Sequence, residues 1–306
     1  MGVAMGVRSL KVTTLADNLV LRPGLHGQWG LSYLLELVDE RGEERRVVFD
    51  TGAAVEPLLH NVEELEVELG EVDAVVLSHG HADHTAATVE VVEASGGCPV
   101  YAHPHCFLPR FYEDKTGKRT RGGVPEGQGI AEIEAAGGRV VLAEGPVEVV
   151  PGLWTTGEVP RVSPFEEVSP PTQGGRRIVV VEGEEVDDQI LCDQALWTEV
   201  VGVGPFVVTG CAHSGVVNTG LRAMELGGFK RLHGFIGGTH LVGRSDEYLA
   251  QTIEALQRFH LSLLSPCHCT GFKAMAKLYH AFPEEFVVNF CGRTIEAGKE
   301  PRNRLI

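Results

Sequence analysis

The sequence lacks any apolar run of roughly eighteen residues, so we expect no membrane-spanning helix. Met1–Leu10 has no basic segment followed by an apolar stretch and a cleavage site, so we expect no secretory signal peptide. Basic side chains are few: 26 lysines and arginines face 42 aspartates and glutamates, and the net charge is −16. Proteins that coat nucleic acids usually present a basic surface, so this balance disfavours that role. A small anionic substrate remains compatible, because bound cations can make a site locally positive in an acidic protein.

The cysteines number seven, an odd count at irregular spacings, which argues against a disulfide framework. In a chain without a signal peptide we interpret them as reduced thiols. Together, the reduced thiols and the missing signal peptide predict a cytoplasmic protein.

Glycine is abundant, with 38 residues among 306, which favours tight turns and a strand-rich fold over a helical bundle. A hydrophobic content of 43% supports one large core, and we expect a single domain over residues 1–306. The two halves share a plan of strands followed by strand–helix alternation, which fits two mixed sheets packed face to face with helices outside. The expected strands are Leu10–Thr14, Leu31–Val38, Val47–Asp50, Ala74–Leu77, Pro99–Ala102, Arg139–Leu142, Val147–Val150, Leu153–Thr156, Arg177–Glu182, Gln189–Cys192, Phe206–Thr209, Leu232–Ile236, Leu261–Leu264, Phe286–Asn289 and Thr294–Glu296, and the expected helices are Val55–Leu69, Ala86–Ala94, Val216–Leu226, Asp246–Phe259 and Phe272–Ala281.

Two segments depart from this alternation. Residues 103–129 lack a periodic pattern and carry a basic cluster from Lys115 to Arg121. We expect either a solvated loop or a mobile basic flap that meets an anionic substrate. The segment Pro160–Gly175 is rich in proline, acidic residues and glycine, and it is the best candidate for a connection between the halves.

The densest polar cluster is Ser78–His84, which holds three histidines and one aspartate directly after an apolar strand. The glycine between His79 and His81 lets both imidazoles turn to one point. Asp83 and His84, at the mouth of the next helix, can aim at a second point nearby. Imidazole and carboxylate suit Zn, Fe or Mn, and the lack of a thiolate in this cluster argues against a closed structural zinc site. The alternative, a polar surface loop, fits poorly with so many histidines behind a buried strand.

This motif resembles that of the metallo-β-lactamase superfamily. The segment Val47–Gly52, Val-Val-Phe-Asp-Thr-Gly, resembles that family's strand ending in Asp-Thr-Gly. Further stretches resemble one branch of the superfamily, labelled 7,8-dihydropterin-6-methyl-4-(β-D-ribofuranosyl)aminobenzene-5′-phosphate synthase-like, and the resemblance covers nearly the whole chain. These stretches are Trp29–Ser32, Thr156–Arg161, Thr209–Gly215, Gly237–Leu241 and Pro266–Gly271.

The resemblance implies an α/β (α+β) fold, a four-layer αββα sandwich of two mixed β-sheets flanked by helices, with metals at one edge. It implies two divalent cations, for which zinc is the first choice and iron or manganese are the alternatives. Carried over residue by residue, the first cation is assigned to His79, His81 and His213, and the second to Asp83, His84 and His268.

Two positions depart from the family pattern. Many binuclear members carry a bridging aspartate where this chain has Cys211, and a histidine where it has Glu158. Cys211 is therefore either a metal ligand or a buried apolar side chain, with water alone bridging the metals. Glu158 and Arg161 are candidates for contacting metal or phosphate, with a turn-stabilising ion pair as the alternative. Asp50 is implied to support the metal loop.

The candidate catalytic residues are Asp83 and His240. Asp83 would orient the nucleophile while it binds the second metal. His240 lies at a strand-to-loop junction, where it would contact substrate or protonate the leaving group, and a structural role is the alternative. His103 and His105 are candidates for substrate contact.

The expected activity is hydrolysis by a metal-activated hydroxide, since cations lower the pKa of bound water to about 7. The expected substrate is a small phosphorylated molecule, in particular a phosphodiester, and nucleic acid is not expected as a partner. The first alternative is the synthase reaction of the branch, which joins a dihydropterin to an aminobenzene ribosyl phosphate through a carbon–nitrogen bond. The second is a mono-iron oxidoreductase, favoured by the loss of the bridging aspartate. A non-catalytic metal-binding protein is the third.

Overall fold

The fold is rich in strands, as the glycine content predicts. The computed structural model describes residues 6–168 and 175–298, so part of the expected connection at Pro160–Gly175 lies outside the described residues. Within these ranges, no helix combines the length and the hydrophobicity needed to cross a membrane. The strands are β1 (Val7–Ala16), β2 (Ser32–Asp39), β3 (Glu44–Phe49), β4 (Ala74–Val76), β5 (Pro99–Ala102), β6 (Arg110–Glu113), β7 (Arg119–Arg121), β8 (Arg139–Leu142), β9 (Glu148–Val150), β10 (Leu153–Thr155), β11 (Arg176–Val181), β12 (Glu184–Asp187), β13 (Ala195–Val200), β14 (Gly204–Thr209), β15 (Gly234–Gly238), β16 (Leu263–Cys267) and β17 (Thr294–Gly298). The helices are α1 (Val55–Glu64), α2 (Ala82–Thr85), α3 (Thr88–Ala94), α4 (Ile130–Ala135), α5 (Val216–Gly227), α6 (Asp246–Gln257) and α7 (Phe272–Ala281), with short 3₁₀ helices η1 (Leu69–Glu71), η2 (Pro104–Phe107) and η3 (His268–Thr270).

Among the described residues, the main sheet has 13 strands, and its principal path is β16-β15-β14-β13-β1-β2-β3-β4-β5-β8. Strand β1 pairs antiparallel with β2 along most of its length, but it pairs with β13 only at Val7 and Val200. The sheet therefore has two halves that are hydrogen-bonded to each other through one residue pair, which leaves them free to turn face to face.

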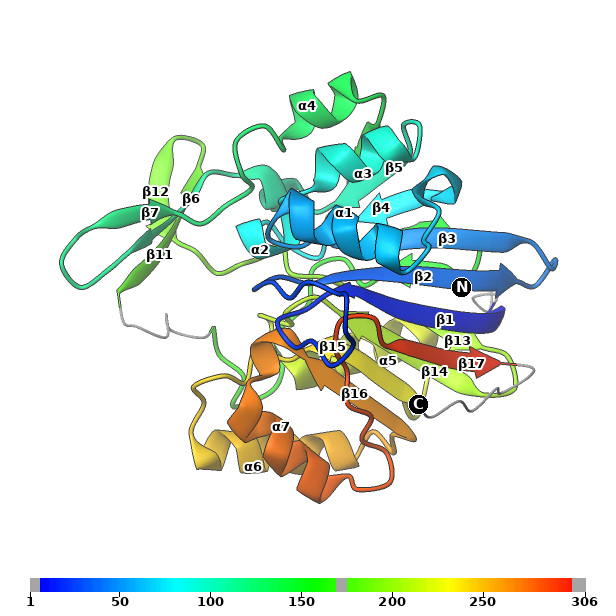
Figure 1. Cartoon of the computed structure of the whole chain (residues 1–306). Coiled ribbons are helices and arrows are strands. Elements are labelled where there is room, and N and C mark those ends of the chain that lie inside the picture. The colour runs from blue at the N-terminus through cyan, green and yellow to red at the C-terminus, as the bar shows by residue number, and fades with distance from the viewer. Residues whose placement is uncertain (1–5, 169–174, 299–306) are drawn as a thin grey trace.

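Alternate residues along the strands point to opposite faces of the sheet. On β3, Val47 and Phe49 lie in a buried cluster with Val208 of β14 and Ile236 of β15, so the two halves pack against each other. Between them, Val48 faces the other way and packs in the cluster that includes helices α1 and α3. The outer face of the second half packs against α5, α6 and α7. Figure 1 shows helices on both sides of the strands, which is the αββα arrangement that the resemblance implied.

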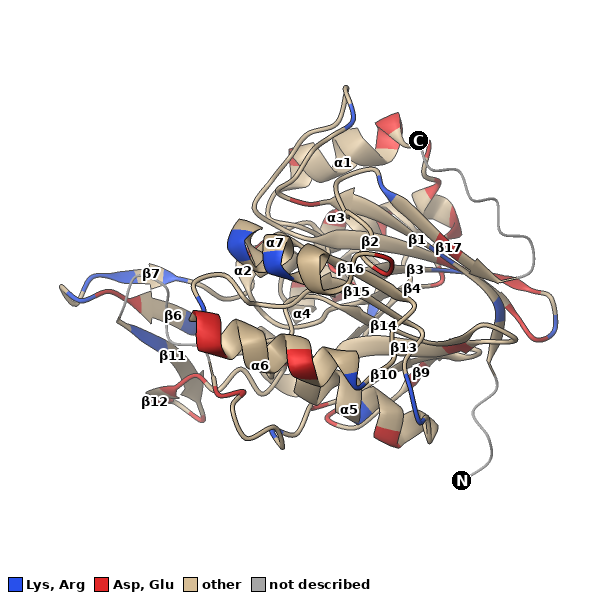
Figure 2. Cartoon of the chain, turned by 90° about the horizontal axis from the view of Figure 1, so that it is seen from below, with Lys and Arg blue, Asp and Glu red and all other residues tan. Residues whose placement is uncertain are grey.

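Residues 103–129 are not a structureless loop. Strands β6 and β7 form a hairpin, and together with β11 and β12 they form a separate four-stranded sheet in the order β12-β11-β6-β7, which we call the arm. The arm protrudes from the sandwich in Figure 1, and Figure 2 shows basic residues on β7 and acidic residues on β12. Local sequence could not predict it, because β6 finds its partner far along the chain, where Phe111 pairs with Ile178.

Two expected strands are wrong. Gln189–Cys192 is a turn, because Ile190 has a left-handed backbone (φ 52°) and its N–H bonds to the Asp188 side chain at 2.8 Å. The strand of this region is instead β13, which was not expected. Phe286–Asn289 contributes only an isolated bridge between Phe286 and Leu264. There the buried Asn289 accepts a hydrogen bond from the Thr14 hydroxyl at 2.7 Å, so side-chain bonding replaces a strand ladder.

The loops that follow β4 and β14 meet at one edge of the sandwich. A Cβ atom on Gly210, after β14, would lie 2.0 Å from the Ser78 hydroxyl, after β4, so only glycine allows this approach. The Gln194 N–H also donates to the Ser78 carbonyl at 2.9 Å. The polar cluster at Ser78–His84 is therefore brought against the loops of the second half.

Helix α5, which begins just after His213, is capped from outside. Its N-cap residue, Gly215, has no side chain for this purpose. The carboxylate of Glu166 instead accepts hydrogen bonds from the N–H groups of Val217 at 2.9 Å and Asn218 at 2.8 Å. The segment before β11 thereby holds the start of the helix in place.

Replacing Glu166 by alanine should lower the free energy of unfolding by about 1–3 kcal/mol, because two buried N–H groups lose their acceptor. Urea denaturation measures this loss. Glu167→Ala, at the exposed neighbour, is the control and should leave the midpoint near that of the unmodified chain. Equal midpoints for the two variants would contradict the capping role.

Candidate metal centre

Three histidine rings converge where the loops meet. His79 and His81 follow β4, and His213 follows β14, from the other half of the sandwich. Their ligand atoms all lie within 4.8 Å of one another, with His79 Nε2 at 2.9 Å from His81 Nδ1 and 3.2 Å from His213 Nε2. We call these residues the first triad. Ring nitrogens of three histidines this close to one another are a typical cation-binding arrangement.

A second group lies beside the first. Asp83 and His84 belong to α2, and His268 follows β16, and their ligand atoms also lie within 4.8 Å of one another. Asp83 Oδ2 is 3.5 Å from His268 Nε2 and 3.9 Å from His84 Nε2. We call these residues the second triad. The structure thus brings together both sets that the resemblance grouped.

Asp50, directly after β3, lies behind both triads and is fully buried. Its carboxylate accepts the N–H and the hydroxyl of Ser78, each at 2.7 Å. The serine oxygen has then used its only proton, so it accepts from His79 Nδ1 at 2.9 Å. Asp50 Oδ2 also accepts from His84 Nδ1 at 2.6 Å. In the neutral state both imidazoles therefore carry their proton on Nδ1 and present the Nε2 lone pair, as histidine ligands do.

Burial sets the protonation states of the first triad. It holds the pKa values of His79 and His213 well below the ordinary histidine range, with neighbouring histidines adding to the effect. Burial also lowers the pKa of His81 to about 4, although Asp83 opposes it. All three rings are therefore neutral at pH 7, which is the form that binds a cation.

The second triad has the opposite balance. Burial acts to raise the pKa of Asp83, but His84 and His268 outweigh it and hold that pKa below its usual range. For His84, burial lowers the pKa while Asp50 and Asp83 raise it, to about 9. Without a cation, His84 is therefore protonated at pH 7 and supplies a positive charge beside the ionised Asp83.

Unpartnered nitrogens provide a test of whether these residues fit a cation. Among the described residues, His213 Nδ1 and both ring nitrogens of His268 are buried without a hydrogen-bond partner. Buried polar atoms normally have partners, and leaving one without a partner costs about 1–3 kcal/mol. A divalent ion would satisfy the ring nitrogen of His268 that faces Asp83, and the nitrogen-and-carboxylate donor set suits Zn, Fe or Mn.

Cys211 lies between the two triads. Its sulfur is 3.1 Å from His84 Nε2, and it forms candidate ligand groups with His79 and His84 on one side and with His268 and Cys269 on another. Burial raises its pKa well above the ordinary thiol value. The position therefore fits either a ligand or a packed thiol, as the sequence left open.

His240 follows β15 and its ring packs on that of His213, with centroids 4.2 Å apart. Its backbone is left-handed (φ 46°), and its N–H donates to Cys269 Sγ at 3.2 Å. Its Nδ1 atom has no partner among the described residues. The ring therefore lies beside the first triad with a buried nitrogen that no described group satisfies, and it forms a further candidate ligand group with Cys211 and His213.

Glu158 and Arg161 lie outside both triads. The half-exposed carboxylate of Glu158 is 4.0 Å from Nε2 of His103, the residue before η2. The His103 ring packs against that of His105, which belongs to η2. Arg161 donates a hydrogen bond to the Gln189 carbonyl. None of the candidate ligand groups among the described residues includes Glu158 or Arg161. The structure therefore gives these two residues contacts with protein groups instead of a place among the converging ligand atoms.

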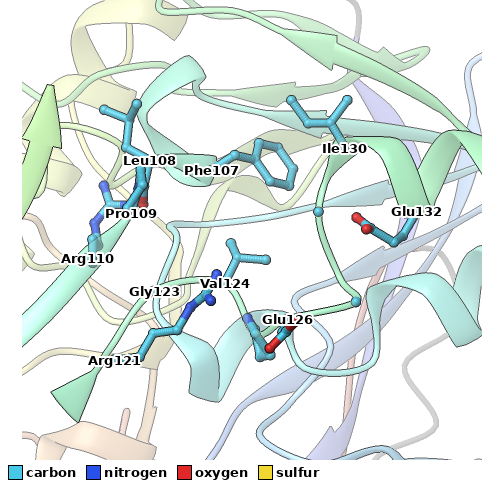
Figure 3. A pocket seen from close by; sticks show the side chains of 13 residues that line it. Phe107, Leu108, Pro109, Arg110, Arg121, Gly123, Val124, Glu126, Ile130 and Glu132 are labelled. Carbon is cyan, nitrogen blue, oxygen red and sulfur yellow. The ribbon is translucent and has the colours of Figure 1, made fainter. Parts of the chain in front are cut away.

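Gly80 connects the first triad to the arm. A Cβ atom on Gly80 would lie 1.9 Å from the backbone oxygen of Cys106. Only glycine at this position therefore allows the loop to approach Cys106 so closely. Arg110, at the start of β6, is buried, and it donates to the same oxygen at 2.9 Å and to Asp188 at 2.8 Å. Figure 3 shows Arg110 in the wall of a pocket of about 370 Å³ that lies between η2 and the loop before α4. The loop that carries His79 and His81 therefore packs closely against the chain that leads into the arm.

Sequence reasoning missed Asp17, which lies just beyond β1. Its carboxylate is buried and accepts a hydrogen bond from the backbone N–H of His268 at 3.1 Å. Burial raises its pKa to about 6. The available signal was the position of Asp17 in Ala-Asp-Asn at the end of the first strand. That signal is weak, because an aspartate after a strand is too common to indicate a contact with His268.

Known proteins resemble this chain over most of its length. A family model described as the metallo-beta-lactamase superfamily matches residues 30–213. A 7,8-dihydropterin-6-methyl-4-(beta-D-ribofuranosyl)-aminobenzene-5′-phosphate synthase of Methanocaldococcus jannaschii is 31% identical over 297 residues, covering 95% of this chain and 97% of that protein. An uncharacterized protein of the same organism is 30% identical, covering 93% of this chain and 99% of that protein.

Two solved structures show the same fold. Tm1679, described as a metal-dependent hydrolase of the beta-lactamase superfamily, superposes with a TM-score of 0.76 at 23% identity, over 95% of this chain and 100% of that one. The metallo-beta-lactamase fold protein YhfI from Bacillus subtilis gives a TM-score of 0.54 at 13% identity, with the same coverage. At these identities the likeness concerns the fold alone.

Proposed function

The chain belongs to the metallo-β-lactamase superfamily, and from that premise we propose that it is a metal-dependent hydrolase of a small phosphorylated substrate, in particular a phosphodiester. The observation that carries this proposal is the convergence of two sets of ligand atoms, each within 4.8 Å, from both halves of the sandwich. Adjacent cation sites suit phosphoryl transfer, because both the attacking and the leaving oxygen need stabilisation.

In this proposal His79, His81 and His213 hold a first divalent cation, and Asp83, His84 and His268 hold a second. When bound, such ions lower the pKa of water and neutralise the charge that grows on the phosphate. Zinc is the first choice, with iron or manganese as alternatives.

The remaining steps fall to the side chains of the chain itself. Asp50 fixes the tautomers of His79, through Ser78, and of His84. Asp83 stays ionised because of its histidine neighbours, so it can accept a hydrogen bond from the attacking water and orient it. His240, whose buried Nδ1 atom has no partner among the described residues, would give a proton to the leaving oxygen.

A second candidate function is synthesis. The curated relative that is 31% identical over 95% of this chain is named as a synthase, and its product carries a 5′-phosphate. Both reactions would use the same cation sites to hold a phosphorylated molecule, so the products distinguish them. Mass spectrometry after incubation with a dihydropterin alcohol and the aminobenzene ribosyl phosphate would reveal a condensation product if the synthase reaction applies.

Metal removal tests the main proposal. Protein freed of metal by a chelator should hydrolyse bis(p-nitrophenyl) phosphate at less than about a hundredth of the rate of the zinc- or manganese-loaded protein, since no other group supplies the nucleophile. Elemental analysis of the active protein should give two cations per chain. One iron per chain, with oxygen consumption in place of phosphodiester hydrolysis, would contradict the proposal.

A further inference from the structure

Trp29 is a large aromatic side chain left in water beside the metal centre. Its side chain is 57% exposed. The other two tryptophans, Trp154 and Trp197, have an aromatic partner within the protein, since their rings stack on each other with centroids 6.0 Å apart. Exposed single hydrophobic residues are common on protein surfaces. What distinguishes Trp29 is its position and the way its backbone is held.

The loop around Trp29 is fixed on both sides. Before it, the side-chain oxygen of Gln28 accepts the N–H groups of Ala53 and Ala54, each at 2.8 Å. After it, Gly30 is pressed against α2, where a Cβ atom would lie 2.7 Å from the Asp83 carbonyl oxygen. The same carbonyl accepts the Leu31 N–H at 3.1 Å. The indole is therefore exposed on a rigid support and not through local disorder.

The indole lies beside the second triad. Its ring centroid is 5.5 Å from that of His268, with the rings tilted by 51°. The His268 N–H is held by Asp17, whose own carbonyl accepts the Gln28 N–H at 3.1 Å. The same short network thus fixes both the candidate ligand His268 and the loop that carries Trp29.

We infer that Trp29 is a stacking platform for a planar aromatic ring of the substrate, bound next to the second triad. This inference rests on the proposed function, because it places the ring beside cations that hold the phosphate. A flat ring that covers the indole removes two apolar faces from water and gains the offset stacking that aromatic pairs prefer. The substrate class is therefore a phosphorylated molecule that carries a planar heteroaromatic group.

Two ligands that differ only by a ring test this inference in the zinc-loaded protein. Guanosine 5′-monophosphate carries a planar base, and ribose 5-phosphate has the same sugar and phosphate without it. Calorimetry should give a dissociation constant about five- to 150-fold lower for the nucleotide, the range expected when one base stacks on one aromatic side chain. The nucleotide, but not the sugar phosphate, should also quench the tryptophan fluorescence.

The decisive variant is Trp29→Ala. It should lose the preference for the nucleotide while it keeps its affinity for ribose 5-phosphate and its zinc content, whereas Trp29→Phe should keep most of the preference. The control is Tyr279→Ala, at an aromatic side chain of similar exposure, 59%, two turns along α7 from Phe272. It should behave as the unmodified chain does.

The outcomes separate the two ideas. A nucleotide preference that persists in Trp29→Ala, or affinities for both ligands that fall together, overturns the stacking role. An unmodified protein that binds ribose 5-phosphate but shows no preference for the nucleotide overturns the stacking role and leaves the proposed function standing. Failure to bind either phosphate overturns both.

Discussion

Replacing His81 by alanine is expected to remove the cation from the first triad and to lower phosphodiester hydrolysis by more than about 100-fold. Loss of a residue behind a metal ligand costs about 10–100-fold in affinity, so loss of a ligand itself should cost more. The fold should change little, because His81 is bonded to α2 through its backbone. Its carbonyl oxygen accepts hydrogen bonds from the Thr85 hydroxyl and the His84 backbone N–H, and the variant keeps both. Elemental analysis and the rate of hydrolysis measure the effect.

The matched control is His105→Ala. His105 is also half-buried and also packs against a histidine, His103, with ring centroids 5.3 Å apart, but it belongs to neither triad. Its metal content should equal that of the unmodified chain. The melting temperatures of the two metal-free variants should be similar. Full metal content and normal turnover in His81→Ala would end the assignment of the first triad.

Replacing Asp50 by asparagine is expected to weaken cation binding by about 10–100-fold, although Asp50 is not a candidate ligand. The carboxylate accepts from three donors, namely the Ser78 N–H, the Ser78 hydroxyl and His84 Nδ1. An asparagine has one acceptor oxygen, and its NH₂ group would face at least one of these donors. The preferred tautomers of His79 and His84 would be lost, and with them the lone pairs directed at both sites. Competition with a chromogenic zinc chelator measures the affinity.

Ser78→Ala provides the comparison for Asp50→Asn. It removes the link to His79 and leaves the bond between Asp50 and His84 in place. We therefore expect weaker binding of one cation in Ser78→Ala and of both in Asp50→Asn. If Asp50→Asn binds two zinc ions as tightly as the unmodified chain, Asp50 does not act through the ligands.

Much of the sandwich could be predicted because the information is local. The continuous apolar run Val47–Phe49 indicates a strand buried on both faces, and the histidines that follow the apolar run Ala74–Leu77 indicate a loop at a strand end. The superfamily and the αββα fold, inferred from the Ser78–His84 motif and the Asp-Thr-Gly strand, are confirmed by the family match and the solved structures. The ligand roles stay predictions, which the His81 variant tests.

The parts that could not be predicted depend on distant partners. The arm forms because β6 pairs with β11, and its base is fixed by the bond between Arg110 and Asp188, which are 78 positions apart in the sequence. Glu166 acts on α5 from 51 positions away. Arg110, Asp188 and Glu166 do not belong to a periodic sequence pattern, so local propensity does not predict their contacts. The apolar side chain of Ile190 favours a strand, but its left-handed backbone, which the sequence does not reveal, forms a turn.

The division of the candidate ligands between the halves has a consequence for biosynthesis. A ribosome releases His79, His81, Asp83 and His84 long before His213 and His268, which follow β14 and β16. Closing such long loops costs entropy that only the docking of the two halves can offset. Under the proposed function, a nascent chain therefore binds a cation only loosely, and tight capture of metal would mark the completion of the tertiary structure.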